Sequence, residues 1–535
     1  MSHQTVSAVV IHDALKTDTE LAFLDVREHG VHSQGHPLFA VPVPLSQFEL
    51  NIARLVPRTS VTIYLMDQGG RDDLALRAAS ILKEMGYTDV SVLENGIYGW
   101  QEAGYEIFSG VNVPSKAFGE FVEHTYSTPH ITAEQLQGRL DAGENITILD
   151  SRPYSEYHRM CIPGGIDMPG AELVNRVFEN MLDETTPIVV NCAGRTRSII
   201  GAQSLINAGV KNPVMALKDG TMGWYLSGYT TENGADRIAP PPTAEMAEKS
   251  GEAAEGFATE IGVSYIEKQD LERLQAQSNE KTIFLLDVRT EEEFLEGHIP
   301  QSQHAPGGQL VQATDEYVGV RGATLILIDD KKVRALMTAS WLKQLGAHHV
   351  YVLSCMSDFE LEAGPAFQVE VQKTSEVNVL ELDAVIHSGE PIAVIDLSNS
   401  LRYRKGHIPN AFWAIRSRLG SDLSFLPPVG LVILTADDVR VAHLAAAEVV
   451  ATRPEVIVRV LEGGNAAWKN ANLKMEMDDT YLLSKADDIW YKPYDNKDKI
   501  RERMQEYLDW ETALVSQIER DGTAKFKTID ELAHK

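Results

Sequence analysis

The chain has 535 residues, too many for one ordinary core, and its length predicts about three to five domains. Its composition, 44% apolar and 23% charged, is that of a globular protein. With 48 basic and 77 acidic residues the formal net charge is −29, which repels phosphate backbones and anionic lipids. We therefore expect no nucleic acid and no membrane among its partners.

The three cysteines, Cys161, Cys192 and Cys355, are too few for a disulfide framework, and none lies in the Cys-x-x-Cys spacing typical of zinc sites. Residues 1–4 open without the basic segment and apolar run of a secretory signal. No stretch approaches the roughly 18 uninterrupted apolar residues of a membrane span. These features predict a cytoplasmic protein whose cysteines stay reduced. Nothing in the sequence specifies an oligomeric state.

Along the chain, an apolar strand that ends in aspartate recurs four times, at Asp25, Asp150, Asp287 and Asp396. Eleven residues after each aspartate the copies have His36, Cys161, His298 and His407. A second apolar strand ends at Asp67, Cys192, Asp329 and Thr435. These recurrences predict four consecutive copies of one unit.

Each copy continues with a helical pattern, which ends at a glycine in the first three copies: Gly86, Gly209 and Gly346. A third strand runs to Leu93, Leu217, Leu353 and Leu461. Seven residues later three copies have Trp100, Trp224 and Trp468, where the third copy has Glu360. Short apolar strands alternating with amphipathic helices predict α/β domains, each with a mostly parallel sheet flanked by helices.

We predict the domain boundaries from these repeats and from the proline-rich stretches between them. The expected segments are a first domain at 5–115, a second at 128–235, a linker at 236–262, a third domain at 263–370, a fourth at 375–476 and a C-terminal tail at 477–535. A charged helical pattern from about 498 to 521 predicts a helix in the tail. The aromatic cluster at 490–494 is expected to pack on a domain surface, with enclosure of a substrate as the alternative.

The loop from Cys192 to Ser198 in the second copy is the stretch most informative about chemistry. It joins a strand predicted at 187–191 to a helix predicted at 199–206. At such a turn backbone N–H groups converge and the helix dipole is positive, which favours a thiolate and holds anions. Arg195 and Arg197 strengthen the same positive field. The loop therefore predicts a nucleophilic thiolate that faces a small anionic substrate.

We assign catalysis to Cys192 and substrate binding to the rest of the loop, namely Ala193, Gly194, Arg195, Thr196, Arg197 and Ser198. Gly194 is expected to let the chain bend so that successive amides point inward. The hydroxyls of Thr196 and Ser198 are expected to hydrogen-bond at the helix start. A guanidinium fork suits an oxyanion, and we favour Arg195 for the substrate and Arg197 for bracing the loop, with the reverse left open.

Only the second copy has a cysteine at this position, so we expect one catalytic domain and three inactive ones. Cys161 and Cys355 are expected to be structural, with a resolving thiol as the alternative for Cys161. The repeated histidines are expected to hydrogen-bond within their domains. No second ligand lies near them at suitable spacing, so we expect no metal and no other cofactor.

These motifs resemble the rhodanese family of sulfurtransferases. Cys192, Arg197 and Ser198 match the family's Cys-x-x-x-x-Arg-Ser pattern. The third copy carries the family's other signature, Asp-Val-Arg at 287–289 followed by Gly-His-Ile-Pro at 297–300. The second copy departs from it, with Met-Cys at 160–161 where Gly-His is usual. The resemblance covers nearly all of residues 5–475.

The resemblance implies a specific chemistry for the loop. The thiolate of Cys192 attacks the sulfane sulfur of a small anionic donor such as thiosulfate, releases sulfite and becomes a persulfide. A thiol or cyanide then takes the sulfur, in two half-reactions with ping-pong kinetics. Mercaptopyruvate or a protein persulfide as donor, and a protein as sulfur acceptor, remain alternatives.

Two rival functions stay open at this point. Phosphatases with a similar anion-binding loop place five residues between cysteine and arginine, whereas four lie between Cys192 and Arg197. The smaller ring favours sulfur over a phosphoryl group. Alternatively, all four copies are recognition surfaces of a non-catalytic binding scaffold.

Overall fold

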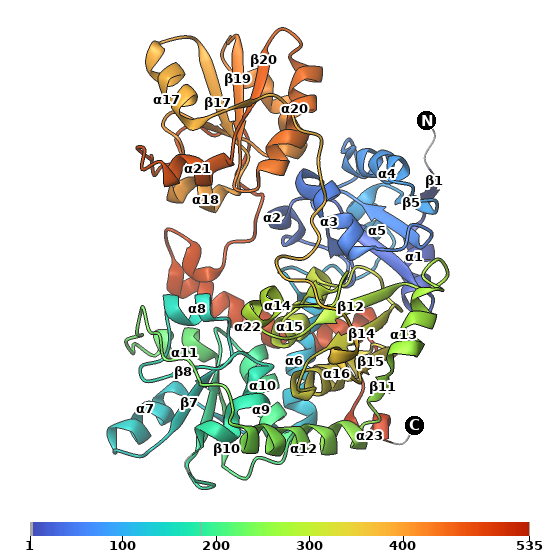
Figure 1. Ribbon diagram of the computed structural model, residues 1–535, viewed down its shortest axis with the longest axis vertical. Coiled ribbons are helices and arrows are strands. Elements are labelled where there is room, and N and C mark those ends of the chain that lie inside the picture. The colour runs from blue at the N-terminus through green and yellow to red at the C-terminus, as the bar shows by residue number, and fades with distance from the viewer. Residues whose placement is uncertain (1–3, 182, 534–535) are drawn as a thin grey trace.

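The computed structural model describes residues 4–181 and 183–533 (Figure 1). Within these residues it contains four sheets of five strands, and all strand pairs are parallel. Each sheet has the same order: the first strand of the repeat at one edge, then the fifth, fourth, second and third. The predicted α/β class, with four tandem units and a helical C-terminal tail, is confirmed.

The strands follow one another along the chain in four sets of five. The first two sheets contain β1 (Gln4–Val6), β2 (Leu21–Asp25), β3 (Val41–Pro42), β4 (Thr62–Met66) and β5 (Val90–Leu93), then β6 (His130–Ile131), β7 (Thr147–Asp150), β8 (Ile166–Asp167), β9 (Ile188–Asn191) and β10 (Val214–Leu217). The other two contain β11 (Ser264–Ile266), β12 (Ile283–Asp287), β13 (Gln303–His304), β14 (Thr324–Ile328) and β15 (His349–Leu353), then β16 (Glu376–Val377), β17 (Ile392–Asp396), β18 (Phe412–Trp413), β19 (Leu431–Thr435) and β20 (Ile457–Leu461).

Helices connect the strands within each repeat and also join the repeats. The first repeat and the segment after it contain α1 (Ala8–Leu15), α2 (His29–His32), α3 (Phe48–Leu55), α4 (Leu74–Glu84), α5 (Gly96–Glu102) and α6 (Val113–Tyr126). The second repeat and the predicted linker contain α7 (Ala133–Asp141), α8 (Tyr154–Arg159), α9 (Glu172–Asn180), α10 (Thr196–Asn207), α11 (Gly220–Leu226) and α12 (Ala244–Glu260).

The remaining helices belong to the last two repeats and the tail. They are α13 (Lys268–Gln275), α14 (Glu291–Glu296), α15 (Gly307–Gln312), α16 (Val333–Leu345), α17 (Val379–Ser388), α18 (Ser400–Lys405), α19 (Leu419–Asp422), α20 (Val439–Thr452), α21 (Gly464–Asn470), α22 (Ile500–Asp521) and α23 (Ile529–Ala533). In the described part of the chain, no helix is both long and apolar enough to cross a membrane.

The central strands form because both sheet faces are covered, so their residues are apolar without alternation. In β9 all four residues, Ile188 to Asn191, are buried. The strand ends at the polar Asn191, whose Nδ2 donates to the Asp150 carboxylate at the end of β7 over 3.1 Å. Parallel strands present their carboxyl ends at one edge, and the residue after Asn191 is Cys192. The sheet therefore delivers the cysteine to that edge.

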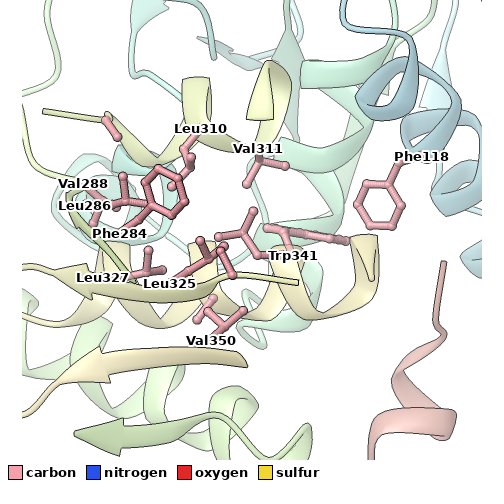
Figure 2. Close-up of a cluster of buried hydrophobic side chains, with 14 of the residues drawn as sticks. Phe118, Phe284, Leu286, Val288, Leu310, Val311, Leu325, Leu327, Trp341 and Val350 are labelled. Carbon is pink, nitrogen blue, oxygen red and sulfur yellow. The ribbon is translucent and has the colours of Figure 1, made fainter. Parts of the chain in front are cut away.

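The second and third repeats are fused through a shared core, which also includes buried residues of the first repeat. Figure 2 shows Phe118 of α6 facing Trp341 of α16, and their ring centroids lie 6.0 Å apart, edge to face. The Trp341 indole N–H donates to Ser204 Oγ of α10 over 2.8 Å. Because α16 packs on α9 and α15 packs on α6 and α10, the third repeat lies against the Cys192 side of the second repeat.

The fourth repeat has two core clusters of its own and stands apart from the second repeat in Figure 1. The tail returns from it to the second repeat, where α22 packs along α6 and contacts α11. Buried Leu514 and Ile518 of α22 pack with Phe108 and Val113. This return brings residues far from Cys192 in the sequence to its side.

The tryptophan that follows the third strand lies in a short helix in three of the repeats. Trp100, Trp224 and Trp468 are buried in α5, α11 and α21. The third repeat, which has Glu360 at that position, has only a 3₁₀ turn at Met356–Asp358. Without a large apolar side chain to bury, this helix does not form there.

Candidate active site

Cys192 lies between the end of β9 and the start of α10, in the wall of a cavity of about 250 Å³. Its side chain is almost closed off from bulk solvent, with 2% of the residue exposed. Its Sγ donates to Ser198 Oγ over 3.5 Å, and Ser198 Oγ donates to the Arg195 carbonyl over 2.7 Å. The thiol is therefore positioned by its own loop and opens only into the cavity.

The start of α11 fixes the direction of the loop's peptide groups. The amides of Thr221 and Met222 donate to the carbonyls of Cys192 and Ala193 over 2.8 and 3.0 Å. In a planar trans peptide the C=O and the following N–H point in opposite directions. The N–H groups of Ala193 and Gly194 therefore point away from α11.

Gly220 makes this approach of α11 possible. Its φ is +55°, in the left-handed region, and a Cβ there would lie 2.4 Å from the carbonyl oxygen of Cys192 and 2.6 Å from that of Gly194. Only glycine satisfies both conditions. In the sequence this glycine lies four residues before the repeated tryptophan, Trp224, but its role beside the cysteine was missed.

The loop retains unused hydrogen-bond donors. Among the residues that the structure describes, the amide N–H groups of Ala193 to Ser198 have no hydrogen-bond partner. Several of them begin α10, where the first N–H groups of a helix have no acceptor inside it and the dipole is positive. The loop can therefore offer a set of main-chain donors to an anion.

Arg195 is held by carboxylates. Its guanidinium donates to Glu120 over 2.6 and 2.8 Å, to Asp219 over 3.0 Å, and also pairs with Glu123. Burial opposes the charge, but these carboxylates outweigh it and raise the pKa of Arg195. The donors of Arg195 are therefore engaged, and it braces the loop against α6, which disfavours our expectation that Arg195 binds the substrate.

Arg197 has fewer partners and lines the cavity. It donates to Glu156 over 2.9 Å and to Gln309 over 3.3 Å. Lys492 of the tail pairs with the same Glu156 over 3.1 Å, so two cations share one carboxylate. Burial opposes ionisation of Glu156, but the charges of Arg197 and Lys492 outweigh it and lower its pKa. This wall of the cavity is left with one net positive charge.

The cavity is built from several separate parts of the chain, which include Glu156 of α8 and Met222 of α11. Besides the loop, its lining includes Lys116 from α6, Gln309 from α15 and three aromatic residues from the tail, Trp490, Tyr494 and Tyr507. The cluster packs on domain surfaces, as expected: Tyr491 contacts Arg404 of the fourth repeat and Tyr494 contacts Arg159 of α8. It also lines the cavity, so enclosure of a substrate, the alternative, stays open. Spacing could not reveal this closure, because it depends on the path of the tail.

Gly194 has a different role from the one expected. Its φ is not in the left-handed region, so the bend does not require glycine. A Cβ at this position would instead lie 2.9 Å from Glu511 Oε2 and 3.2 Å from the Tyr507 ring. Glycine is needed because the tail helix packs directly on the loop.

The other three repeats have no thiol at the equivalent position. The residue there makes hydrogen bonds within its own repeat. Asp67 accepts from the Ala75 amide over 3.0 Å, and Asp329 accepts from the Arg334 amide over 2.8 Å. Thr435 Oγ1 donates to Asn465 over 2.7 Å.

The other two cysteines contribute nothing to the cavity. Cys161 is fully buried beside Tyr157, and burial raises its pKa to about 11, which disfavours a thiolate. Cys355 lies within 3.1 Å of Ser357 Oγ in the third repeat.

The repeated histidines hydrogen-bond within their own repeats. His36, His298 and His407 each contact a nearby carbonyl oxygen through Nδ1, over 2.8 to 3.0 Å. Folding also brings Glu476 and Asp478 within 4.8 Å of His407, a proximity that sequence spacing missed. Both carboxylates already accept backbone hydrogen bonds, Glu476 from Asn410 and Asp478 from Thr480.

Comparison with known proteins identifies the family to which these repeats belong. The family model described as rhodanese-like domain matches residues 8–103, 132–227 and 269–355. The crystal structure of a thiosulfate sulfurtransferase from Pseudomonas aeruginosa is 44% identical, with a TM-score of 0.93, over 98% of this chain and 99% of that one.

Two further relatives match parts of the chain. A Bacillus subtilis protein described as a candidate sulfur carrier is 28% identical over 185 residues, which is 34% of this chain and 91% of that protein. An HTH-type transcriptional regulator of Mycobacterium tuberculosis is 36% identical over 105 residues, 20% of this chain. This chain matches only 45% of the regulator's length.

Proposed function

This chain belongs to the rhodanese family and is a rhodanese-type sulfurtransferase, and from that premise we propose that it moves a sulfane sulfur from thiosulfate to a thiophilic acceptor through a persulfide on Cys192. The supporting observation is the cavity itself. It combines the one loop thiol, a row of unused amide donors and a wall with net positive charge. A small dianion with a transferable sulfur suits all three features.

In the first half-reaction the Cys192 thiolate attacks the outer sulfur of thiosulfate. The S–S bond of the donor breaks, its electron pair leaves with sulfite, and Cys192 becomes a persulfide. The amides of residues 193–198 stabilise the negative sulfur before and after transfer, since they are fixed in place before the reaction.

In the second half-reaction a thiolate or cyanide attacks the terminal sulfur of the persulfide. The bond between the two sulfurs breaks, and its electron pair returns to Cys192 Sγ. The enzyme alternates between two stable forms, so ping-pong kinetics follow. Because Cys192 must stay a free thiol between cycles, a reducing, cytoplasmic setting is part of the proposal.

We assign the sulfonate oxygens of the donor to Arg197 together with Lys492. Arg197 presents a planar fork in the cavity lining, and Glu156 holds it from one side without satisfying the charge of both cations. Catalysis belongs to the second repeat alone in this proposal. Asp67, Asp329 and Thr435 have no thiol and cannot form a persulfide. Their side chains hydrogen-bond within their own repeats.

The deciding experiment is intact-mass measurement before and after incubation with thiosulfate. The wild type should gain one sulfur atom, and Cys192→Ser should gain none. Folded wild-type protein that gains no sulfur from thiosulfate or mercaptopyruvate would refute the proposal. Faster loading from mercaptopyruvate than from thiosulfate would identify mercaptopyruvate as the preferred donor. Hydrolysis of an aryl phosphate that is lost in Cys192→Ser would favour the phosphatase alternative.

A further inference from the structure

The C-terminal tail forms one wall of the cavity over Cys192, and it is firmly attached there. Asp495 pairs with Arg159 of α8 over 2.8 Å, and the Arg159 guanidinium lies 4.9 Å from the Tyr494 ring centroid. On the other side the rings of Trp490 and Tyr507 lie 5.9 Å apart. The segment at 490–495 is therefore a fixed wall held from two sides.

This wall limits what can reach the sulfur atom. Cys192 is only 2% exposed, and its cavity of about 250 Å³ corresponds to the liquid volume of roughly eight water molecules. To reach Sγ, a folded partner would have to bring one of its cysteines inside this cavity. A molecule of several heavy atoms fits inside.

The charges of the lining favour an anion. Arg195 is engaged by three carboxylates outside the lining, Glu120, Glu123 and Asp219, and Lys116 pairs with Glu511 over 3.3 Å. Arg197 and Lys492 share Glu156, which leaves one positive charge. Burial and neighbouring Asp315 raise the pKa of Glu316, the other acid in the lining, while Lys492 and Arg54 act in the opposite direction. The lining as a whole has four cations, Lys116, Arg195, Arg197 and Lys492, against two acids.

Ping-pong transfer leaves this positive subsite free for the acceptor. Sulfite departs before the acceptor enters, so a carboxylate of the acceptor can occupy the position that the sulfonate held. Trp490 and Tyr494, which line the cavity, supply an apolar surface for the carbon chain between carboxylate and thiol.

From the wall, the volume and the charge, and resting on the proposed function, we infer that the tail makes this enzyme selective for a small thiol that carries a carboxylate, and excludes protein acceptors. The acceptor first releases its thiol proton to solvent. Its thiolate attacks the terminal persulfide sulfur, the bond between that sulfur and Cys192 Sγ breaks, and Sγ keeps the electron pair. The products are the acceptor persulfide and the Cys192 thiolate, with no external oxidant or reductant.

The test begins with protein loaded by thiosulfate, freed of excess donor and checked for one added sulfur by intact mass. Three small thiols are then compared at equal thiolate concentration: 3-mercaptopropionate, neutral 2-mercaptoethanol and cationic cysteamine. Reduced thioredoxin serves as a protein dithiol. The loss of the added sulfur is followed by quenched intact mass. Each rate is divided by the rate of the same thiol with a small disulfide, because intrinsic nucleophilicity differs.

We expect the normalised rate to be at least tenfold higher for 3-mercaptopropionate than for cysteamine, and lowest for thioredoxin. Lys492→Met should reduce the charge preference severalfold, and Lys492→Arg should restore it. Lys497→Met is the matched control, since Lys497 is exposed in the same tail, pairs with Asp479 and lies outside the cavity lining. It should keep the wild-type preference.

The outcomes separate the two proposals. Failure of the wild type to load with sulfur contradicts the persulfide function itself. Normal loading followed by equal normalised rates for anionic and cationic thiols, by fastest discharge to thioredoxin, or by an unchanged preference in Lys492→Met overturns the acceptor inference alone.

Discussion

Glu511 of the tail helix lies against Gly194 of the active-site loop, so closely that a Cβ at residue 194 would come within 2.9 Å of Glu511 Oε2. The other oxygen, Oε1, accepts from Tyr507 over 3.1 Å and from Thr196 over 3.4 Å, and pairs with Lys116 over 3.3 Å. One fully buried carboxylate thus joins α22, α6 and the start of α10. The tail is part of the active-site loop's support.

Gly194→Ala should displace the loop and slow sulfur uptake at least tenfold, because the new methyl group meets a buried carboxylate that cannot move away freely. The rate of sulfur gain from thiosulfate, followed by intact mass, measures the effect. Gly138→Ala is the control: Gly138 lies in α7 of the same repeat, and its Cβ would meet nothing within 4 Å. The control should load normally and be slightly more stable. Equal loading rates in the two variants would contradict the packing argument.

The repeat and its chemistry could be predicted from the sequence because they are local. Strand, loop and helix are contiguous around Cys192, so periodicity and the helix start were enough to place this thiol between a strand end and a helix start. Its reactivity stays a prediction. The role of each arginine, by contrast, depends on partners that lie far from the loop in the sequence. Glu120 and Glu123, which engage Arg195, lie on α6 more than 70 residues away, and no spacing rule relates them to the loop.

The closure of the cavity was the least predictable feature for the same reason. Lys492 and Tyr507 reach Cys192 only because the chain passes through two further repeats and then returns along α6 (Figure 1). The aromatic residues at 490–494 were visible in the sequence, but their neighbours were not.

Substitution of the two loop arginines should affect different properties: Arg197 the KM for thiosulfate, and Arg195 the stability of the fold. Arg197→Gln should raise the KM for thiosulfate about tenfold with little change in Tm, since Glu156 keeps Lys492 as its partner. Arg195→Gln leaves the buried Glu120 carboxylate without its cation and should destabilise the protein by about 3 kcal/mol. Steady-state kinetics and thermal unfolding test both variants. The opposite pattern, with KM raised in Arg195→Gln at unchanged Tm, would return the substrate role to Arg195.

Cys161→Ala should retain turnover with thiosulfate and cyanide near the wild-type level. Cys161 is fully buried beside Tyr157, and its raised pKa keeps it a thiol at neutral pH. The variant leaves a small gap, so its Tm should fall by a few degrees. A persulfide that forms on Cys192 but is no longer passed on in this variant would instead show that Cys161 acts as a resolving thiol.

Glu28 should make the contact between the first and fourth repeats sensitive to pH. Its carboxyl is buried and accepts from Ser46 Oγ over 2.9 Å and from Ser417 Oγ, in the fourth repeat, over 2.8 Å. Burial raises its pKa from about 4.5 to about 7, against the smaller effect of these hydrogen bonds. The folded protein therefore binds a proton here that the unfolded chain has released between those two values.

Because the folded state holds more protons in this window, stability from Glu28 is complete below about pH 4.5 and is lost as the pH rises to about 7. The loss is on the order of 3 kcal/mol. Glu28→Gln keeps a hydrogen-bond acceptor without the titration. Its Tm should fall less than that of the wild type between pH 5 and pH 7.5, measured in buffers of equal ionic strength. Burial also raises the pKa of Asp167 to about 7. This residue is present in both proteins, so its contribution cancels in the comparison. Parallel Tm curves for the two proteins would show that Glu28 is ionised at low pH in the folded state.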